Sequence, residues 1–443
     1  MSKIRLHGTS SGYVEIAPAA TASNNTLTAP STVGEIIAKD AAGAIGITSM
    51  KASNVNVGAA VTITESGIEA SGIGITCANI NGTQIGGRRN LIINGAMQIA
   101  QRGTSATSSG YVVDRFRPHW NGTDESPTQA QVTLTSAVGP YLEGHRKSLR
   151  ITNGNQTTSP AVDDYIIIET KIEAQDIASS GWNYTSTSSF ITLSFWVKSS
   201  VAQTFYGLVR SIDGTSQAFP IETGSLTADT WKKVIYKIPG NSNLTFDNDS
   251  NHGLNIRIVP FRGTDATGSV TLGQWGAFNS SVQFPDNTTT WYTTNDSTFE
   301  VTGFQLEVGS QVTPFEHRSF AEELNLCKRY YQKSYAYGTA PGTTNSFLNQ
   351  LIGRAYASVS NRMELNTRFE VEMRTTPTMT TYTPSGGTSG DVEDYSSGNG
   401  TAAGTARDVS AVRNTGNKGF GGITVSSPQD GVLGLHYTAD AEM

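Results

Sequence analysis

The chain has 443 residues, enough for two to four domains at roughly 100–200 residues each. Glycine is frequent, with 46 residues, and only 15% of residues are charged, against about 25% in an ordinary globular protein. This composition excludes a charged disordered tail, a helical bundle and a long coiled coil. The net charge of −6 argues against nucleic acid as a partner. A β-rich protein with many turns remains.

The cysteines and the start of the chain are informative about its compartment. Cys77 and Cys327 fit neither a disulfide framework nor a zinc motif, so we expect free, buried thiols. The first residues are polar, without the apolar stretch of a signal peptide or the ~20-residue span of a membrane helix. We therefore expect a soluble protein that is synthesised in a cytoplasm and does not insert into membranes.

Residues 1–88 have a composition of their own, since 21–87 contain no aromatic residue. Isoleucines recur there at a spacing of five between Ser-Gly and Asn-Gly turns, in two series: Ile63, Ile68 and Ile73, then Ile75, Ile80 and Ile85. One such strip buries too little apolar surface to fold alone, whereas three strips around one axis would cover each other. The pattern predicts a fibrous shaft in a homotrimer, with a flexible linker as the alternative.

Residues 89–318 alternate as β-strands do. Ile191, Leu193, Phe195 and Val197 share one strand face, and Phe190 and Trp196 point to the other. Two further inward sets follow, at 234, 236 and 238 and at 254, 256 and 258. These strands, separated by Gly, Asn, Ser and Asp turns, predict a β-sandwich of the jelly-roll type.

A later strand of this segment changes parity. Phe299 and Val301 share one face, but Phe304, Leu306 and Val308 require the other. One extra residue at Thr302-Gly303 would restore a common face, so we expect a β-bulge that contains the glycine.

Residues 319–443 begin with a predicted helix, 320–332. Ser319 and Glu322 form a capping box, and apolar or aromatic residues follow at 320, 324, 327 and 331. We expect this stripe to pack on the sandwich, with a threefold interface as the alternative. Further β pattern predicts a small β domain, and residues 384–404, rich in Gly, Ser and Thr, predict an exposed loop.

Several segments resemble parts of one module. Residues 89–103 (RNLIINGAMQIAQRG) and 113–116 (VDRF) resemble the opening of a jelly-roll module of bacteriophage tail fibres. Residues 304–310 (FQLEVGS) and 313–319 (TPFEHRS) resemble its closing signature, and 322–331 (EELNLCKRYY) is similar to the helix that follows it.

The two ends extend the resemblance over the whole chain. Residues 6–20 and 435–443 are similar to the start and end of tail fibre proteins of marine phages or cyanophages. The resemblance implies a virion protein, located in the tail, that is attached through its N-terminal end to other tail proteins. It also implies a jelly roll similar in plan to carbohydrate-binding modules, which is an analogy at the level of the fold.

Nothing in the sequence predicts an enzyme. The six histidines are scattered, and no metalloprotease, nucleophile-elbow or phosphate-loop motif is present. The carboxylate pairs Asp163-Asp164 and Glu322-Glu323 are only local doublets, and 247–251 lacks the glycine and glutamate of a calcium loop. We expect no catalytic residue, no metal site and no cofactor.

Aromatic and acidic side chains on loops are the candidate binding residues. Trp182 with Tyr184, and Trp291 with Tyr292, lie among polar residues and could stack on sugar rings. Burial against a loop or a neighbouring chain is the alternative for each ring, and for Trp196. In the loop 384–404, the candidates for glycan binding are Asp391, Glu393, Asp394 and Tyr395.

The combined prediction is a homotrimeric phage tail fibre that adsorbs to a host surface glycan or lipopolysaccharide. Its predicted parts are an attachment and shaft segment (1–88), a jelly roll (89–318), and a helix with a distal β domain (319–443). Several weak sites would act together through effective concentration. The alternatives are a tailspike-like polysaccharide depolymerase and a structural virion fibre or decoration protein without a receptor role.

Overall fold

The computed structural model describes residues 4–7, 13–16, 88–356, 362–395, 403–426 and 431–443. At the N-terminal end, β1 (Ile4–His7) and β2 (Tyr13–Ile16) form an antiparallel hairpin. The isoleucine series, and with it the predicted shaft, lies outside the described residues, as does Cys77. Cys327 is a free thiol and is buried, as expected.

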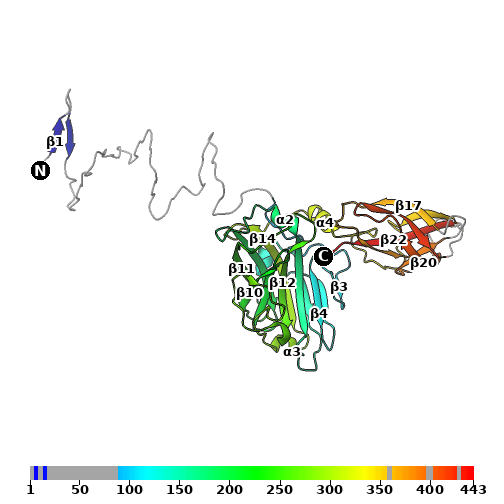
Figure 1. Ribbon diagram of the computed structural model, residues 1–443, viewed down its shortest axis with the longest axis horizontal. Coiled ribbons are helices and arrows are strands. Elements are labelled where there is room, and N and C mark those ends of the chain that lie inside the picture. Colours follow the sequence, from blue (N-terminus) through cyan, green and yellow to red (C-terminus); the bar gives the residue numbers. More distant parts are fainter. Residues whose placement is uncertain (1–3, 8–12, 17–87, 357–361, 396–402, 427–430) are drawn as a thin grey trace. The chain divides into compact units, whose positions relative to one another are not determined.

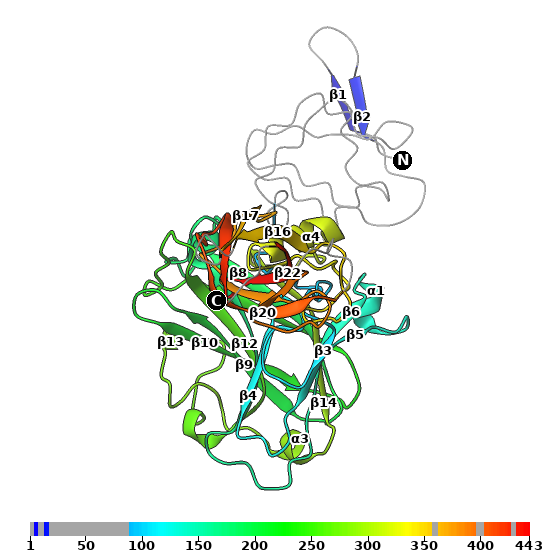
Figure 2. The same cartoon turned by 90° about the vertical axis from the view of Figure 1, so that its right-hand side faces the viewer.

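A sandwich of two antiparallel six-stranded sheets follows, and Figure 2 shows the two layers side by side. The first sheet consists, in spatial order, of β13 (Gly276–Ala277), β10 (Gln217–Ser225), β9 (Thr204–Ser211), β12 (His252–Arg262), β7 (Tyr165–Glu173) and β4 (Arg117–Asn121). The second consists of β11 (Lys232–Pro239), β8 (Phe190–Ser199), β14 (Thr298–Val308), β6 (Lys147–Thr152), β5 (Thr128–Thr133) and β3 (Ser105–Ala106).

The distal domain is built on the long strand β22. Its eight-stranded sheet runs β15 (Tyr331–Lys333), β22 (Gly431–Asp440), β16 (Leu351–Tyr356), β17 (Arg362–Arg368), β21 (Gly419–Val425), β20 (Thr405–Val412) and β19 (Asp391–Asp394), with β18 (Thr378–Tyr382) paired to β22. Because β19 also pairs with β22, the strands from β22 through β16 to β19 close into a ring.

Helices are few and short in the described residues. They are α1 (Gly139–Leu142), α2 (Ala174–Ala178), α3 (Thr290–Thr293) and α4 (Phe320–Lys328), with one 3-10 turn, Thr264–Ala266. None of those described is long and apolar enough to cross a membrane. The predicted all-β fold class with a jelly-roll sandwich, one helix near 320 and a distal β domain is confirmed (Figure 1).

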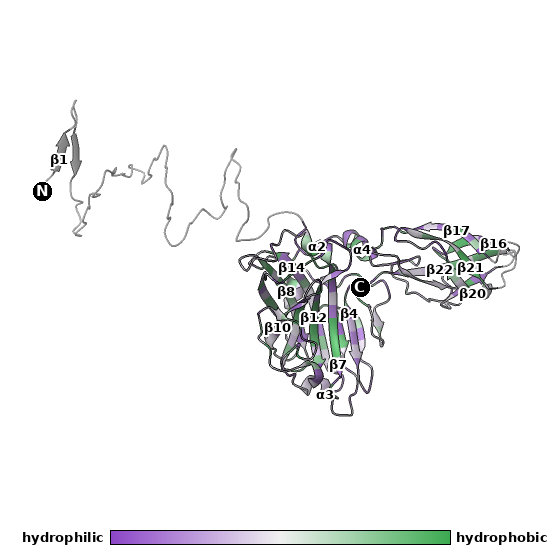
Figure 3. Ribbon diagram, in the orientation of Figure 1, coloured by the Kyte–Doolittle hydropathy of each residue, from purple (hydrophilic) through white to green (hydrophobic). Residues whose placement is uncertain are grey.

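The predicted strand faces are also confirmed. Ile191, Leu193, Phe195 and Val197 are at most 1% exposed and lie in the sandwich core, whereas Trp196 is half-buried on the other face. Figure 3 shows apolar residues on the central strands β7 and β12 of the facing sheet. The alternation of residues along β8 therefore determines which face of this strand packs against the other sheet.

The parity change in β14 is a β-bulge. The register of β14 against β8 shifts between Thr302 and Gln305, and Gly303 has a φ of +66°, a conformation that favours glycine. The bulge turns Phe304 inward, where its ring stacks on Phe195 with centroids 4.9 Å apart and an interplanar angle of 6°.

The helix α4 begins as predicted but ends earlier. The Ser319 hydroxyl accepts a hydrogen bond from the Glu322 amide, and the Glu322 carboxylate accepts one from the Ser319 amide. The helix ends at Lys328 rather than at 332, because Tyr331 begins β15 and pairs with Asp440 of β22. Tyr331 thus lies on a strand and does not extend the helical stripe.

We predict opposite outcomes for two isoleucines of β11. Ile238 is fully buried, whereas Ile235 is 48% exposed on the other face. Ile238→Asp places an unpaired carboxylate in the core, a change that costs several kcal/mol and prevents folding. Ile235→Asp should yield soluble protein with the thermal midpoint of the wild type. Circular dichroism of both purified variants is the measurement, and a native-like Ile238→Asp protein would contradict this strand assignment.

Candidate binding site between the jelly roll and the distal domain

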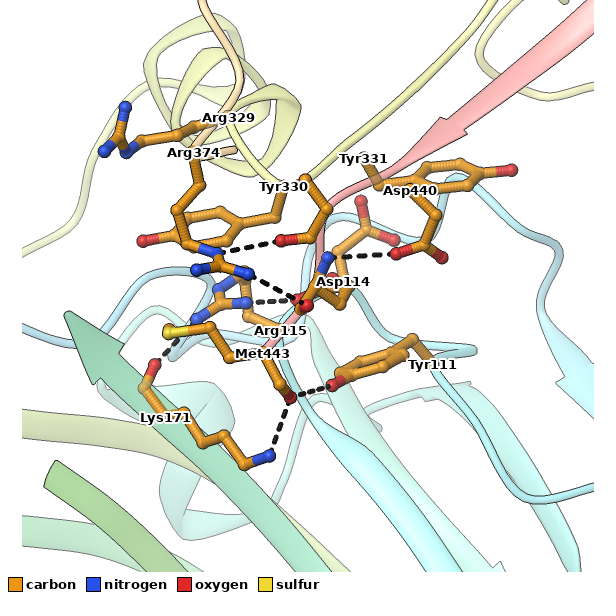
Figure 4. A network of polar contacts seen from close by, with 12 residues as sticks. Tyr111, Asp114, Arg115, Lys171, Arg329, Tyr330, Tyr331, Arg374, Asp440 and Met443 are labelled. Atoms are coloured by element: carbon orange, nitrogen blue, oxygen red, sulfur yellow. Dashed lines mark hydrogen bonds and ion pairs between the residues drawn. The ribbon is translucent and has the colours of Figure 1, made fainter. Parts of the chain in front are cut away.

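A buried ionic network joins the last residues of the chain to the jelly roll (Figure 4). Glu442, with a side chain only 5% exposed, forms ion pairs with Arg115 and, at 3.5 Å, with Arg102. Arg102 also binds Asp440, with 3.0 Å between Nη2 and Oδ2. Burial lowers the pKa of Arg102, but Glu442, Asp114 and Asp440 together raise it above its ordinary value. The guanidinium is thus held charged where three carboxylates converge.

A second set of contacts joins the same two domains. Arg329, which follows α4, donates two hydrogen bonds of 2.6 and 2.8 Å to the carboxylate of Glu173 on the jelly roll. The Tyr330 hydroxyl donates to the same carboxylate at 2.6 Å. Burial alone would raise the pKa of Glu173, but the hydrogen bonds from Arg329 and Tyr330 have the larger effect, so the pKa lies below its ordinary value. The Arg115 guanidinium lies over the ring of Tyr330, 3.4 Å from its centroid.

The Glu442 ion pairs should dominate the stability of this junction. In Glu442→Gln the amide keeps the shape of the side chain, but Arg115, 3% exposed, loses its counter-charge. Breaking a buried pair in this way costs about 3–5 kcal/mol. Glu370, whose carboxylate pairs with Lys328 and is 68% exposed, supplies the control. Glu370→Gln should cost less than about 1 kcal/mol. Chemical denaturation of the full chain compares the two, and equal losses would contradict a dominant role for Glu442.

Beside the ionic network lies a cleft of about 600 Å³, lined by Arg102, Tyr331, Pro341, Thr378, Thr380, Tyr382, Thr438, Asp440 and Glu442. Its floor is the sheet β18–β22–β15, in which Thr378 and Tyr331 both pair with Asp440. The period of two puts the first, third and fifth residues of β18 on one face, so Thr378, Thr380 and Tyr382 face the cleft together. The opposite face of β22 carries Tyr437 and Ala439 into the core of the distal domain, and Ala441, directly after the strand, joins the same core.

The cleft combines one accessible ring with hydrogen-bonding groups. Tyr331 is 3% exposed and its ring is covered by the Arg102 guanidinium, 3.6 Å from the ring centroid, so the ring open to a ligand is that of the half-buried Tyr382. The hydroxyls of Thr378 and Thr380 form no hydrogen bond with another residue in the described part of the chain. The Asp440 side chain is 41% exposed. Donors, acceptors and the ring of Tyr382 are therefore available together to a polar ligand with C–H faces.

The four aromatic candidates from the sequence lie elsewhere, and three are core residues. Trp182, Trp291 and Tyr292 are at most 3% exposed, which leaves no ring face for a ligand. Trp291 donates from Nε1 to the Thr298 carbonyl, and the Tyr292 hydroxyl donates to Asp164 at 3.1 Å. Tyr184 is half-buried, with its ring edge-on to Phe246 at 5.0 Å. The three buried aromatics complete the sandwich core, which is the burial that the sequence left open as the alternative for each ring.

The acidic candidates belong to a strand and not to an exposed loop. Asp391 is half-buried on β19, where burial and the neighbouring Asp408 raise its pKa. Glu393, 1% exposed, accepts hydrogen bonds from the amides of Ser385 and Gly404 at 2.6 and 2.5 Å. Glu393 thus holds the backbone of this segment, and β19 replaces the predicted loop over this part of 384–404; residues 396–402 lie outside the described residues.

The remaining two candidates of this segment are also engaged in structure. Asp394, 1% exposed, pairs with Arg407 at 3.2 Å. The Tyr395 hydroxyl donates to Gln350 at 2.8 Å, and its ring is 7% exposed. Neither side chain is presented to solvent, so neither supports the predicted glycan contact.

Sequence reasoning missed the cleft residues and one further ring. Trp275, half-buried, lines a smaller hollow of about 310 Å³ over β10, together with Pro220, Gln274 and Gln283. The Thr-x-Thr-x-Tyr alternation of 378–382 was a usable signal for the cleft floor. Arg102 carried no signal for the cleft, because the cleft residues that it contacts, Tyr331 and Asp440, are more than 200 residues away in the sequence.

No family model and no curated protein matches the chain. Among solved structures, the N-terminal cellulose-binding domain of Cellulomonas fimi β-1,4-glucanase C matches 48% of this chain and 97% of its own, with 11% identity and a TM-score of 0.23. A family 11 carbohydrate-binding module from Clostridium thermocellum, in complex with a β-1,3-1,4-mixed-linked tetrasaccharide, matches 48% and 99%, with 12% identity and a TM-score of 0.21. A putative sugar-binding protein from Bacteroides thetaiotaomicron matches 50% and 100%, with 11% identity and a TM-score of 0.27. The fold assignment above depends on the chain's own strand order and not on these matches.

Proposed function

We propose that the chain is a glycan-binding adsorption protein of a phage tail fibre, and that it acts as a homotrimer. The observation that carries glycan binding is the cleft, in which the ring of Tyr382 lies together with threonine hydroxyls, the carboxylate of Asp440 and the guanidinium of Arg102, which covers Tyr331. A pyranose ring offers C–H faces to aromatic rings and hydroxyls to such polar groups. The tail location and the trimer are supported by the sequence resemblance and by the isoleucine series of 63–85.

The contacts of the carboxylates favour glycan binding without hydrolysis over the depolymerase alternative. In the cleft, Asp440 and Glu442 both form ion pairs with the same arginine, Arg102, whereas hydrolysis requires two carboxyl groups on opposite sides of the scissile bond. The sequence doublets have structural tasks, since Asp164 accepts from Tyr292 and Glu322 caps α4. A depolymerase would release reducing ends from host polysaccharide, and their appearance would overturn the assignment.

We predict that a glycan bound in the cleft contacts Thr380 and Tyr382. Thr380→Val and Tyr382→Ala should each weaken binding of the full chain to a glycan array or to isolated host polysaccharide, Tyr382→Ala at least about tenfold, which is 1.4 kcal/mol. Trp275→Ala is the matched control, because Trp275 lines the other hollow. If binding survives in Tyr382→Ala but is lost in Trp275→Ala, the jelly-roll surface is the binding site and the cleft is not.

The trimer is tested separately. Sedimentation equilibrium of the full chain at micromolar concentration should give three times the protomer mass of 47.1 kDa. Three copies would allow weak sites to act together through effective concentration. A single species with the protomer mass would remove the homotrimer from the proposal and leave glycan binding untouched.

A further inference from the structure

A groove of about 730 Å³ lies on the distal domain over β17 and β21. It is distinct from the cleft, because the two share no lining residue. Four of its lining side chains are cationic, Arg362, Arg368, Arg413 and Lys418, and Glu364 is the single acidic one.

The groove exists because β21 lacks side chains where β17 carries them. Gly419 pairs with Arg368, Gly421 pairs with Asn366, and Gly422 stands where the register shifts between Met363 and Asn366. The glycine backbone thus forms a floor beside a row of arginines. Phe420 alternates with these glycines and is 2% exposed, with its ring in the core below.

The arginines of β17 are available to a ligand. Arg362 and Arg368 are exposed and form no ion pair within the described residues. Arg413 donates to the Thr424 hydroxyl at 2.6 Å, and Lys418 pairs with Glu372 at 3.4 Å on the open surface. In a chain with a net charge of −6, this concentration of cations opposes the overall charge.

We propose that this groove binds an acidic polysaccharide through its sulfate, phosphate or carboxylate groups. Guanidinium groups bind oxyanions with two parallel hydrogen bonds, and the side-chain-free floor leaves room for a chain of sugars between them. Nucleic acid is disfavoured, because no exposed aromatic ring is among the lining residues to stack on bases. The site is independent of the proposed glycan cleft.

The experiment measures binding of the full chain to dextran sulfate and to uncharged dextran of the same length by calorimetry. Wild type should bind dextran sulfate, more weakly as salt rises, and should not bind dextran. The double variant Arg362→Gln, Arg368→Gln should weaken binding at least tenfold. Arg146→Gln, a change of an exposed arginine on the jelly roll, should leave it unchanged. Equal weakening by both variants would mean a diffuse charge effect and overturn the site.

A second variant blocks the groove without altering charge. A Cβ at Gly421 would lie 3.6 Å from the Leu365 carbonyl oxygen and 3.8 Å from the Asn414 side chain, which are ordinary contacts. Gly421→Leu should therefore fold and should abolish dextran sulfate binding. Unchanged binding in this variant contradicts the proposal, as does tighter binding of a single-stranded oligonucleotide. Polygalacturonate in place of dextran sulfate tells whether carboxylates are accepted as well as sulfates.

Discussion

The burial of Glu442 between two arginines is the constraint on which the junction of the jelly roll and the distal domain depends. Its carboxylate binds Arg102, which precedes β3, and Arg115, which precedes β4 of the jelly roll. A buried charge without these partners is very costly, so the end of the chain must lie where the arginines are. Around it, Arg329 and Tyr330 fix Glu173, and Arg374 donates to the carbonyls of Ala441 and Ser250. These polar contacts position the two domains together with an apolar cluster, in which Ile93 and Ile99 of the jelly-roll segment pack with Cys327 and Tyr330.

Arg102 has a part in both the junction and the cleft. It pairs with Asp440 and Glu442, and its guanidinium covers Tyr331. A ligand hydroxyl that bonds to Asp440 would therefore meet a carboxylate that is already oriented by an arginine. Such preorganisation lowers the cost of ordering a site on binding. The same arrangement means that a change at Arg102 disturbs stability and binding together, so Thr380 and Tyr382 report on the ligand more cleanly.

The local features of the fold were readable in the sequence, and the long-range ones were not. The inward face of β8, the capping box of α4 and the bulge at Gly303 each depend on neighbours a few residues apart. The opening and closing motifs were recognised separately, and the structure packs them together: Asn90 donates to the Phe304 carbonyl, and Glu316 accepts from the amides of Arg89 and Asn90. By contrast, the sequence around Trp291 resembles a loop, because the burial of this ring depends in part on Phe205 of the distant strand β9, in addition to Phe299 of the following strand β14. The cleft could not be predicted for the same reason, because the strands that carry Tyr331 and Tyr382 are brought together by pairing with β22.

The strand β22 pairs with β15, β16, β18 and β19, so four segments of the distal domain receive their hydrogen-bonding partner from residues 431–440. During synthesis, none of these segments can complete its pairing until that strand has left the ribosome. Contacts between residues so distant in sequence form slowly, and unpaired edges meanwhile offer themselves to other chains. Truncation of the chain before residue 431, by a premature stop codon or by a protease, would therefore produce a fragment that aggregates and not a smaller functional protein.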